Sequence, residues 1–236
     1  MGVLGALLAL AGTLPRLLPH ILSVLRDDIV FRVSPRLGNC TVYLTIDDGP
    51  SEQTPAILAI LKRHHVHATF FITTDHIHDA AQIDAITEAG HALGNHLPTT
   101  KAASQLTLAE FKRDFDRAAA VLEQYHATRL VRLPSNFGTR AQTDYVRAQG
   151  CTVVAGTVFP LDHAIADATW TRRLAEWLTI DGGVIILHDG RERGRRTAEV
   201  LDRLIPDLQA RGFAFGDLAA ALPDLPVDPQ VAASPQ

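Results

Sequence analysis

The sequence predicts an α/β domain with about seven parallel strands, arranged as a barrel or as a doubly wound sheet. From residue 40 onward, short apolar runs alternate with amphipathic helical patterns, and neither an internal repeat nor an interdomain linker interrupts them. The chain has 236 residues, of which 47% are hydrophobic and 20% charged, and this composition suits one large packed domain. Strands that alternate with helices imply parallel pairing and right-handed crossovers.

The expected strands are seven short apolar runs, and six stretches with helical periodicity lie between them. The strands are expected at residues 41–46, 68–72, 92–95, 129–132, 152–157, 182–187 and 213–215. The helices are expected at residues 54–64, 79–89, 107–126, 140–149, 168–178 and 195–211. Thr107 and Glu110 form a capping box at the start of the third helix. Gly90, Gly150 and Gly212 each end a helix just before a strand.

The expected helix at 168–178 carries both tryptophans of the chain, Trp170 and Trp177. Because they lie seven residues apart, they share one face of the helix. We expect that face to pack against the core of the domain.

The two ends of the chain differ from the region between them. Residues 1–15 carry no charged side chain, but Pro15 and Arg16 interrupt the apolar pattern before it is long enough to span a membrane. A secretory signal would need basic residues before the apolar stretch and a clear cleavage site. We therefore expect residues 1–39 to form an apolar segment, either packed on the domain or lying at a membrane surface through residues 1–25.

This segment favours a membrane-associated or cell-envelope location over a plain cytoplasmic one, although no clear signal peptide is present. The catalytic domain is expected at residues 40–222. Residues 223–236 are rich in proline, alanine, aspartate and glutamine, which is typical of a disordered tail.

Charge and cysteine content exclude some classes of function. The net charge is −4, so the chain has no basic surplus for a phosphate backbone and we expect no nucleic-acid partner. Cys40 and Cys151 form neither a zinc-type spacing nor a disulfide framework. A single bridge between these two cysteines remains open from the sequence alone.

Ionisable side chains follow five of the expected strands. In β/α barrels the chemistry gathers at the carboxyl ends of the strands, where such side chains meet. A lone histidine after a strand is more often a local hydrogen-bonding residue than a ligand, but five strand ends contribute here. In chain order these side chains are Asp47 and Asp48, His96, Arg132, Asp162 and His188.

Asp47 and Asp48 form the most informative part of this set. They end the apolar strand in the stretch Thr45-Ile46-Asp47-Asp48-Gly49-Pro50. Two buried carboxylates are costly unless each is paired, hydrogen-bonded or bound to a cation. Neighbouring side chains in a strand point to opposite sides, so one can hold a metal while the other takes a proton. An acidic turn before a helix is the simpler interpretation.

Taken in order, the motifs at these strand ends resemble those of the polysaccharide deacetylase family, also called the NodB-homology or chitin-deacetylase-like family. The resemblance extends over residues 40–221. It implies a distorted (β/α) barrel, a divalent metal that is usually zinc, and removal of acetyl groups from sugar polymers. By the same resemblance, Asp47 is the general base, Arg132 pairs with it, and Asp48 and His96 are metal ligands. The position of the family's second metal histidine is occupied by Thr100.

The later motifs imply the remaining roles. His188 is the expected general acid, oriented by Asp162. Pro134, Ser135 and Phe137 are the expected substrate-binding residues, and a backbone N–H near Ser135 is expected to stabilise the oxyanion. The third motif departs from the family pattern because Phe137 comes two places later, and the fourth lacks the usual tryptophan.

The sequence therefore predicts a metal-dependent hydrolase that removes N- or O-acetyl groups from a glycan. Two alternatives remain open. A deformylase or deacetylase of a lipid-linked sugar would explain the apolar N-terminus. A non-catalytic glycan-binding relic of the fold would explain Thr100, because a hydroxyl is a poor zinc ligand beside imidazole and carboxylate.

Overall fold

The computed structural model describes residues 21–34, 40–165, 167–190 and 194–222. At its centre is a seven-stranded sheet whose strand pairs are all parallel. The strand order is β5-β4-β3-β2-β1-β6, and β7 pairs with the start of β1. The strands are β1 (Cys40–Asp47), β2 (Thr69–Ile72), β3 (Ala92–Asn95), β4 (Leu130–Val131), β5 (Thr152–Val153), β6 (Val184–His188) and β7 (Phe213–Phe215).

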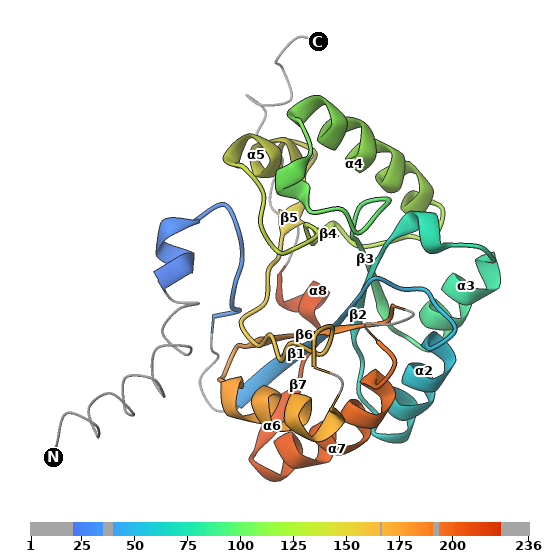
Figure 1. Ribbon diagram of the computed structural model, residues 1–236, viewed down its shortest axis with the longest axis vertical. Coiled ribbons are helices and arrows are strands. Elements are labelled where there is room, and N and C mark those ends of the chain that lie inside the picture. The colour runs from blue at the N-terminus through green and yellow to red at the C-terminus, as the bar shows by residue number, and fades with distance from the viewer. Residues whose placement is uncertain (1–20, 35–39, 166, 191–193, 223–236) are drawn as a thin grey trace, which may run out of the picture.

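Helices connect the strands and lie around the outside of the sheet, as Figure 1 shows. The longer helices are α2 (Thr54–Arg63), α3 (Ala80–Glu88), α4 (Leu108–Glu123), α5 (Arg140–Ala148), α6 (Ala168–Leu178) and α7 (Thr197–Ala210). Three short helices complete the described elements: η1 (Thr74–His76), η2 (Ala103–Gln105) and α8 (Leu218–Ala221). The largest buried apolar cluster packs α2, α3 and α7 against β1, β2 and β6. This arrangement leaves the carboxyl ends of the strands for the site.

The segment at residues 29–33 connects the two edges of the sheet, β5 and β6. The Val30 N–H donates a hydrogen bond of 2.8 Å to the Val153 carbonyl oxygen. The Val33 N–H donates one of 2.9 Å to the Gly182 carbonyl oxygen, just before β6. The segment therefore closes the curved sheet into a distorted barrel, the fold that the sequence predicts.

All seven expected strands and all six expected helices are present, with bounds that differ by a few residues. The largest difference is the expected strand 152–157, since β5 ends at Val153. Beyond that residue, Val154 bridges to Val30 and Val158 bridges to Ile185. Between these two bridges the chain changes its pairing partner from the segment at residues 29–33 to β6. Apolar periodicity does not reveal such a change of partner.

The expectation that Trp170 and Trp177 face the core is wrong. Their exposed fractions are 66% and 38%. The buried face of α6 is made of small side chains, including Ala168, Thr171 and Ala175. Small residues let α6 lie close to the domain, and the two tryptophans lie outside its buried face.

The described part of the N-terminal segment begins with a helical stretch at residues 21–25. Its side chains Ile21, Val24 and Leu25 are exposed by 46%, 75% and 64%. Among the described residues, no helix is long and apolar enough to cross a membrane. The expectations for residues 1–20 and 223–236 lie outside the described residues. Cys40 and Cys151 are not joined by a disulfide, so the bridge that the sequence left open does not form.

Candidate active site

The turn after β1 places both aspartates at the carboxyl end of the barrel. Asp48 adopts a φ of 69°, which turns the chain directly after Asp47. Behind this turn, the Asp189 N–H donates to the Asp47 carbonyl oxygen at 2.7 Å. The hydroxyls of Ser51 and Thr54 donate to the buried Asp189 carboxylate. Burial raises the pKa of Asp189 to about 6. Asp189 therefore holds the turn in place through hydrogen bonds to residues on both sides of it.

Asp47 is held by a buried guanidinium. The Nη1 of Arg132 lies 2.7 Å from the Oδ1 of Asp47 and 2.6 Å from the Oγ1 of Thr45. Arg132 is completely buried, and its guanidinium carbon lies 4.1 Å from the centre of the Phe71 ring. Burial lowers the pKa of Arg132, and the charge of Asp47 opposes that effect. The arrangement orients the Asp47 carboxylate firmly.

Asp48 and His96 face each other on the same rim. The Oδ1 of Asp48 lies 3.4 Å from the Nε2 of His96, and both side chains are buried. The Nδ1 of His96 lies 2.8 Å from the Arg132 carbonyl oxygen, so Nδ1 carries a proton and Nε2 faces Asp48. A separation of 3.4 Å suits two ligands that each lie about 2.1 Å from one tetrahedral ion.

Thr100 lines the same cavity as Asp48 and His96, and it offers only a hydroxyl. The residues present thus fit two of the three protein positions that a catalytic zinc usually takes, and they do not fit the third.

His188 and Asp162 form a second ion-paired unit. The Nδ1 of His188 lies 2.8 Å from the Oδ1 of Asp162, whose Oδ2 accepts the His188 backbone N–H at 2.8 Å. Burial lowers the pKa of His188, but the hydrogen bond and charge of Asp162, with the charges of Asp47 and Asp48, outweigh it. The net effect raises the pKa of His188 above its ordinary value.

One cavity of about 530 Å³ brings these groups together. Asp47, Asp48, His96 and His188 line it, whereas Arg132 and Asp162 stand behind two of them. This volume is within the usual range for small-ligand sites and can hold a sugar unit.

The three expected substrate residues, Pro134, Ser135 and Phe137, also line the cavity. Ser135 and Asn136 both adopt a positive φ, of 66° and 63°. The Asn136 N–H donates to the Leu133 carbonyl oxygen at 2.8 Å. Within the described part of the chain, the Ser135 N–H makes no such bond. It is therefore available to a ligand, as are the N–H groups of Phe137 and Gly138, which likewise have no acceptor among the described residues.

The sequence reasoning missed several residues of the site. Leu22 and Phe31 of the N-terminal segment line the cavity, and the ring centroids of Phe31 and Phe137 are 6.1 Å apart. His163 also lines it, although only Asp162 was singled out in that loop. The adjacency of His163 to Asp162 was a usable signal. Nothing in the local pattern of residues 22–31 indicates a position beside the strand ends.

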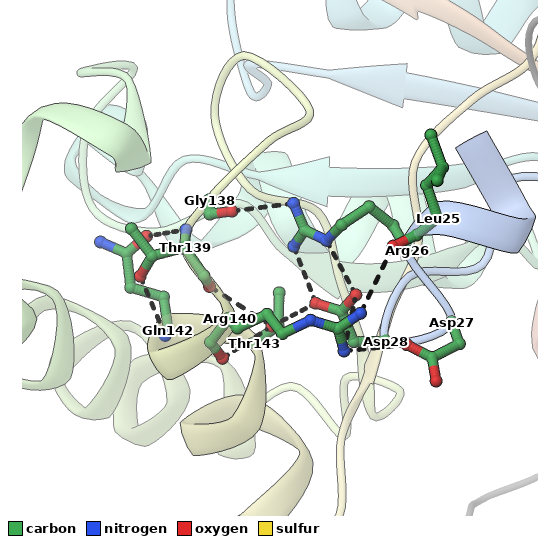
Figure 2. A network of polar contacts seen from close by, with 9 residues as sticks. All are labelled: Leu25, Arg26, Asp27, Asp28, Gly138, Thr139, Arg140, Gln142 and Thr143. Carbon is green, nitrogen blue, oxygen red and sulfur yellow. Dashed lines mark hydrogen bonds and ion pairs between the residues drawn. The ribbon is translucent and has the colours of Figure 1, made fainter. Parts of the chain in front are cut away.

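Figure 2 shows the polar network that fixes the N-terminal segment beside the cavity. The guanidinium of Arg26 donates to both oxygens of Asp28, at 2.8 and 2.7 Å, and to the Gly138 carbonyl oxygen at 3.1 Å. The Thr143 hydroxyl donates to Asp28 from the first turns of α5. Arg26 thereby ties the N-terminal segment to the end of the loop that carries Ser135.

Comparison with known proteins finds both related sequences and related folds. Residues 35–154 match the family model described as polysaccharide deacetylase. The chain is 31% identical over 210 residues to a chitooligosaccharide deacetylase of Sinorhizobium fredii, which covers 79% of this chain and 95% of that protein.

Two solved structures share the fold. A peptidoglycan N-acetylglucosamine deacetylase has a TM-score of 0.77 at 24% identity, covering 85% of this chain and 95% of that one. A family 4 acetyl xylan esterase of Clostridium thermocellum, in complex with a cobalt ion, has a TM-score of 0.71 at 27% identity. That alignment covers 77% of this chain and 89% of the esterase.

Proposed function

Because this chain belongs to the polysaccharide deacetylase family, we propose that it hydrolyses acetyl groups from a carbohydrate. One observation carries the proposal: Asp47 and His188, each oriented by a buried ionic partner, line the same cavity. A carboxylate and an imidazole arranged in this way are suited to remove one proton and to deliver another.

Asp47 is the proposed base. Its Oδ1 is held by Arg132, and its carboxylate reaches the cavity, where it takes a proton from the attacking water. The Ser135 N–H is the proposed donor to the oxygen that becomes negatively charged as the tetrahedral intermediate forms.

The proposed cofactor is a divalent ion, zinc by preference, with Asp48 and His96 as its protein ligands in this cavity. Such an ion, when bound, polarises the acetyl carbonyl and makes water more acidic.

His188 is the proposed acid. Its raised pKa favours the protonated imidazole, and Asp162 holds Nδ1 so that Nε2 is the nitrogen left to donate. Proton delivery to the departing sugar amine or alkoxide completes the cleavage. An amide and an ester both suit this arrangement.

Acetate release tests the proposal directly. The full chain is incubated with acetylated chitooligosaccharides, peptidoglycan and acetylated xylan, and acetate is measured. We expect release from at least one of them, and we expect Asp47→Asn to reduce the rate by roughly 10²-fold or more. Asp84→Asn, on an exposed face of α3, is the matched control. The proposal fails if no substrate releases acetate, or if Asp47→Asn retains the wild-type rate.

The N-terminal segment supports a proposal about where the reaction takes place. Ile21, Val24 and Leu25 are exposed, while Leu22 of the same helical stretch lines the cavity. Residues 1–20 contain a single charged side chain, that of Arg16. An apolar helix face of this kind binds the interface of a lipid bilayer. The cavity would then open beside a membrane, where an envelope glycan or a lipid-linked sugar is within reach.

Vesicle flotation tests this location. We expect the full chain to float with anionic phospholipid vesicles, and we expect the triple variant Ile21→Ser, Val24→Ser and Leu25→Ser to lose most of that binding. Leu108→Ser changes an exposed leucine of α4 and serves as the control. If the full-length protein stays in the unbound fraction, the proposal that this segment binds a membrane is wrong.

A non-catalytic glycan-binding relic is the second candidate function, and Thr100 favours it. Loss of one protein ligand can remove most of the affinity for a metal. Retained binding of chitooligosaccharides, with no acetate release and no rescue by Thr100→His, is the result that would favour the relic over the enzyme.

A further inference from the structure

Helix α6 carries both tryptophans of the chain outside its buried face. Trp170 and Trp177 are exposed by 66% and 38%, although tryptophan is on average a well-buried residue. Their separation of seven residues places them on one face of the helix, about two turns apart. The buried face is occupied by Ala168, Thr171 and Ala175, which pack against the domain. The two indole rings are therefore a surface feature that neither the core nor the proposed chemistry uses.

Arg173 lies between the two tryptophans on the same face. It is three residues after Trp170 and four before Trp177, which are the spacings of neighbours on a helix surface. Arg173 is exposed, and its side chain makes no hydrogen bond or ion pair with the described residues. A guanidinium with its N–H donors thus lies between two aromatic rings. We call Trp170, Arg173 and Trp177 the tryptophan face.

The tryptophan face lies beside the cavity. Leu178, which directly follows Trp177 and ends α6, lines the cavity. His163, in the loop before α6, lines it as well. Helix α6 therefore connects two parts of the cavity wall, and its exposed side continues the surface at the edge of the cavity.

A row of exposed indoles and hydrogen-bond donors suits an extended glycan. One face of a pyranose ring consists of C–H groups that pack on an indole, while the hydroxyls at the ring edge need hydrogen-bond partners. Seven residues of α-helix advance about 10.5 Å, which is the length of about two β-1,4-linked pyranose units. Alternate units of such a chain have the same orientation. The spacing of Trp170 and Trp177 therefore lets each stack on one of two alternate units.

A lipid bilayer and a second copy of the chain fit the tryptophan face less well. A helix that lies in a bilayer surface needs a continuous apolar face, whereas Arg173 interrupts this one. Two indoles supply at most about 500 Å² of contact, which is less than the roughly 800 Å² per partner that a specific protein interface buries. A glycan has an independent reason to be there, because a polymer bound in the cavity must leave it over the rim.

We propose that Trp170, Arg173 and Trp177 form a binding site for an extended β-1,4-linked glycan, outside the catalytic cavity. The two tryptophans stack on alternate sugar units, and Arg173 donates hydrogen bonds to the hydroxyls of the unit between them. The proposal rests on the proposed function in one respect, since the glycan on α6 is the polymer whose acetyl groups are removed in the cavity. Affinity should then depend on chain length, because only a long glycan reaches both places.

Tryptophan fluorescence tests the site directly, because Trp170 and Trp177 are the only tryptophans of the chain. The full chain is titrated with chitohexaose and, at the same concentrations, with chitobiose. The indole emission is recorded, and the affinity is measured by calorimetry. We expect chitohexaose to change the emission until it saturates, and we expect chitobiose to leave it nearly unchanged because it cannot contact both rings.

Variants of exposed residues measure the contribution of each side chain. The double variant Trp170→Ala and Trp177→Ala should weaken chitohexaose binding at least about 10-fold. Arg173→Ala should weaken it by about 3-fold or more. Alanine is the best helix former, so α6 should be retained, and circular dichroism checks this. Leu108→Ala changes an exposed leucine of α4 and is the matched control, with affinity expected to stay within about 2-fold of wild type.

The deacetylation assay gives a second readout. In the double variant the KM for long glycans should rise at least about 10-fold, whereas acetate release from chitobiose should keep its wild-type rate. A variant that only disturbed the fold would lower both.

Two results would overturn the proposal. One is an emission that stays unchanged with chitohexaose, xylohexaose and soluble peptidoglycan fragments. The other is a double variant that binds chitohexaose as tightly as wild type does. An emission change that phospholipid vesicles cause and glycans do not would assign the tryptophan face to a membrane instead. A change on raising the protein concentration alone would assign it to a second copy, and either result would also overturn the proposal.

Failure of this site and failure of the proposed function are distinguishable. Glycan binding at the two tryptophans without acetate release from any substrate would leave the site in place and remove the proposed function. Acetate release from chitobiose, with no emission change on adding longer glycans, would keep the proposed function and remove the site.

Discussion

The Oδ1 of Asp47 lies 2.7 Å from the Nη1 of Arg132, although their strands are not neighbours in the sheet. Asp47 ends β1 and Arg132 directly follows β4, with β3 and β2 between them. The ion pair can form only because the sheet curves enough for these strand ends to meet across the barrel. The Asp47–Arg132 pair and the curvature of the sheet therefore depend on each other.

Removal of the guanidinium tests that dependence. Arg132→Met leaves a buried carboxylate without its ionic partner, and we expect a loss of about 3–5 kcal/mol in the free energy of unfolding. Urea unfolding measures this loss, and acetate release should disappear with it.

The double variant Asp47→Ala with Arg132→Met separates charge from packing. It should recover part of the lost stability, because no uncompensated charge remains buried, and it should recover no activity. Arg129→Met changes an exposed arginine just before β4 and is the control, with an expected effect within about 0.5 kcal/mol. A loss below about 1 kcal/mol for Arg132→Met would contradict the importance of the pair.

Thr100→His is expected to complete the ligand set around Asp48 and His96. A second imidazole beside a carboxylate and a histidine that are 3.4 Å apart supplies the missing third ligand. Elemental analysis should show an increase of about one zinc per chain, and acetate release should rise at least about 10-fold. Thr99→His places the same side chain one residue earlier, at an exposed position, and should change neither quantity.

The raised pKa of His188 predicts a specific NMR titration in metal-free protein. The imidazole should titrate above its ordinary value of about 6.5, and Asp162→Asn should lower that pKa because it removes the charge that stabilises imidazolium. Because the pKa of His188 is higher in the folded state than in the unfolded state, protonated His188 stabilises the folded protein. This contribution to the free energy of unfolding is fully present below the unfolded-state pKa and is lost as the pH rises through the folded-state pKa. An unchanged titration in Asp162→Asn would show that the two residues are not coupled.

The network in Figure 2 predicts different effects for two adjacent aspartates. Asp28 is buried and accepts hydrogen bonds from Arg26 and Thr143, so Asp28→Asn should cost about 2 kcal/mol at neutral pH. Asp27 forms an exposed pair with Arg140, so Asp27→Asn should lower the free energy of unfolding much less than Asp28→Asn does. Urea unfolding of both variants measures the difference, and equal costs would contradict the role of the buried network.

The pH dependence of this network follows from the direction in which the pKa of Asp28 is shifted. The hydrogen bond from Arg26 holds the pKa of the Asp28 carboxyl well below its usual range. The stabilisation is present above the unfolded-state pKa of about 3.9 and is lost as the pH falls through the lower folded-state value. The difference in the free energy of unfolding between Asp28→Asn and wild type should therefore become smaller when unfolding is measured in strong acid.

Much of the fold could be predicted because it depends on local pattern. Apolar runs and helical periodicity located the described strands β1 to β7 and the six longer helices between them, but not the short helices η1 and η2. The capping box at Thr107 and Glu110 is present in α4. The orientation of Trp170 and Trp177 could not be predicted in this way. It depends on the close packing of α6, which its small residues permit.

The sequence by itself determined the chemical groups of the site, since the barrel geometry brings strand ends together. Asp47, Asp48, His96 and His188 are indicated by the sequence alone, because each follows a predicted strand. Only the tertiary structure decided that Leu22 and Phe31 form part of the cavity, and that His163 lies beside His188 in its wall. These placements depend on contacts between segments far apart in the chain and on the path of one loop. A local pattern records which residues are present, whereas packing decides which of them meet.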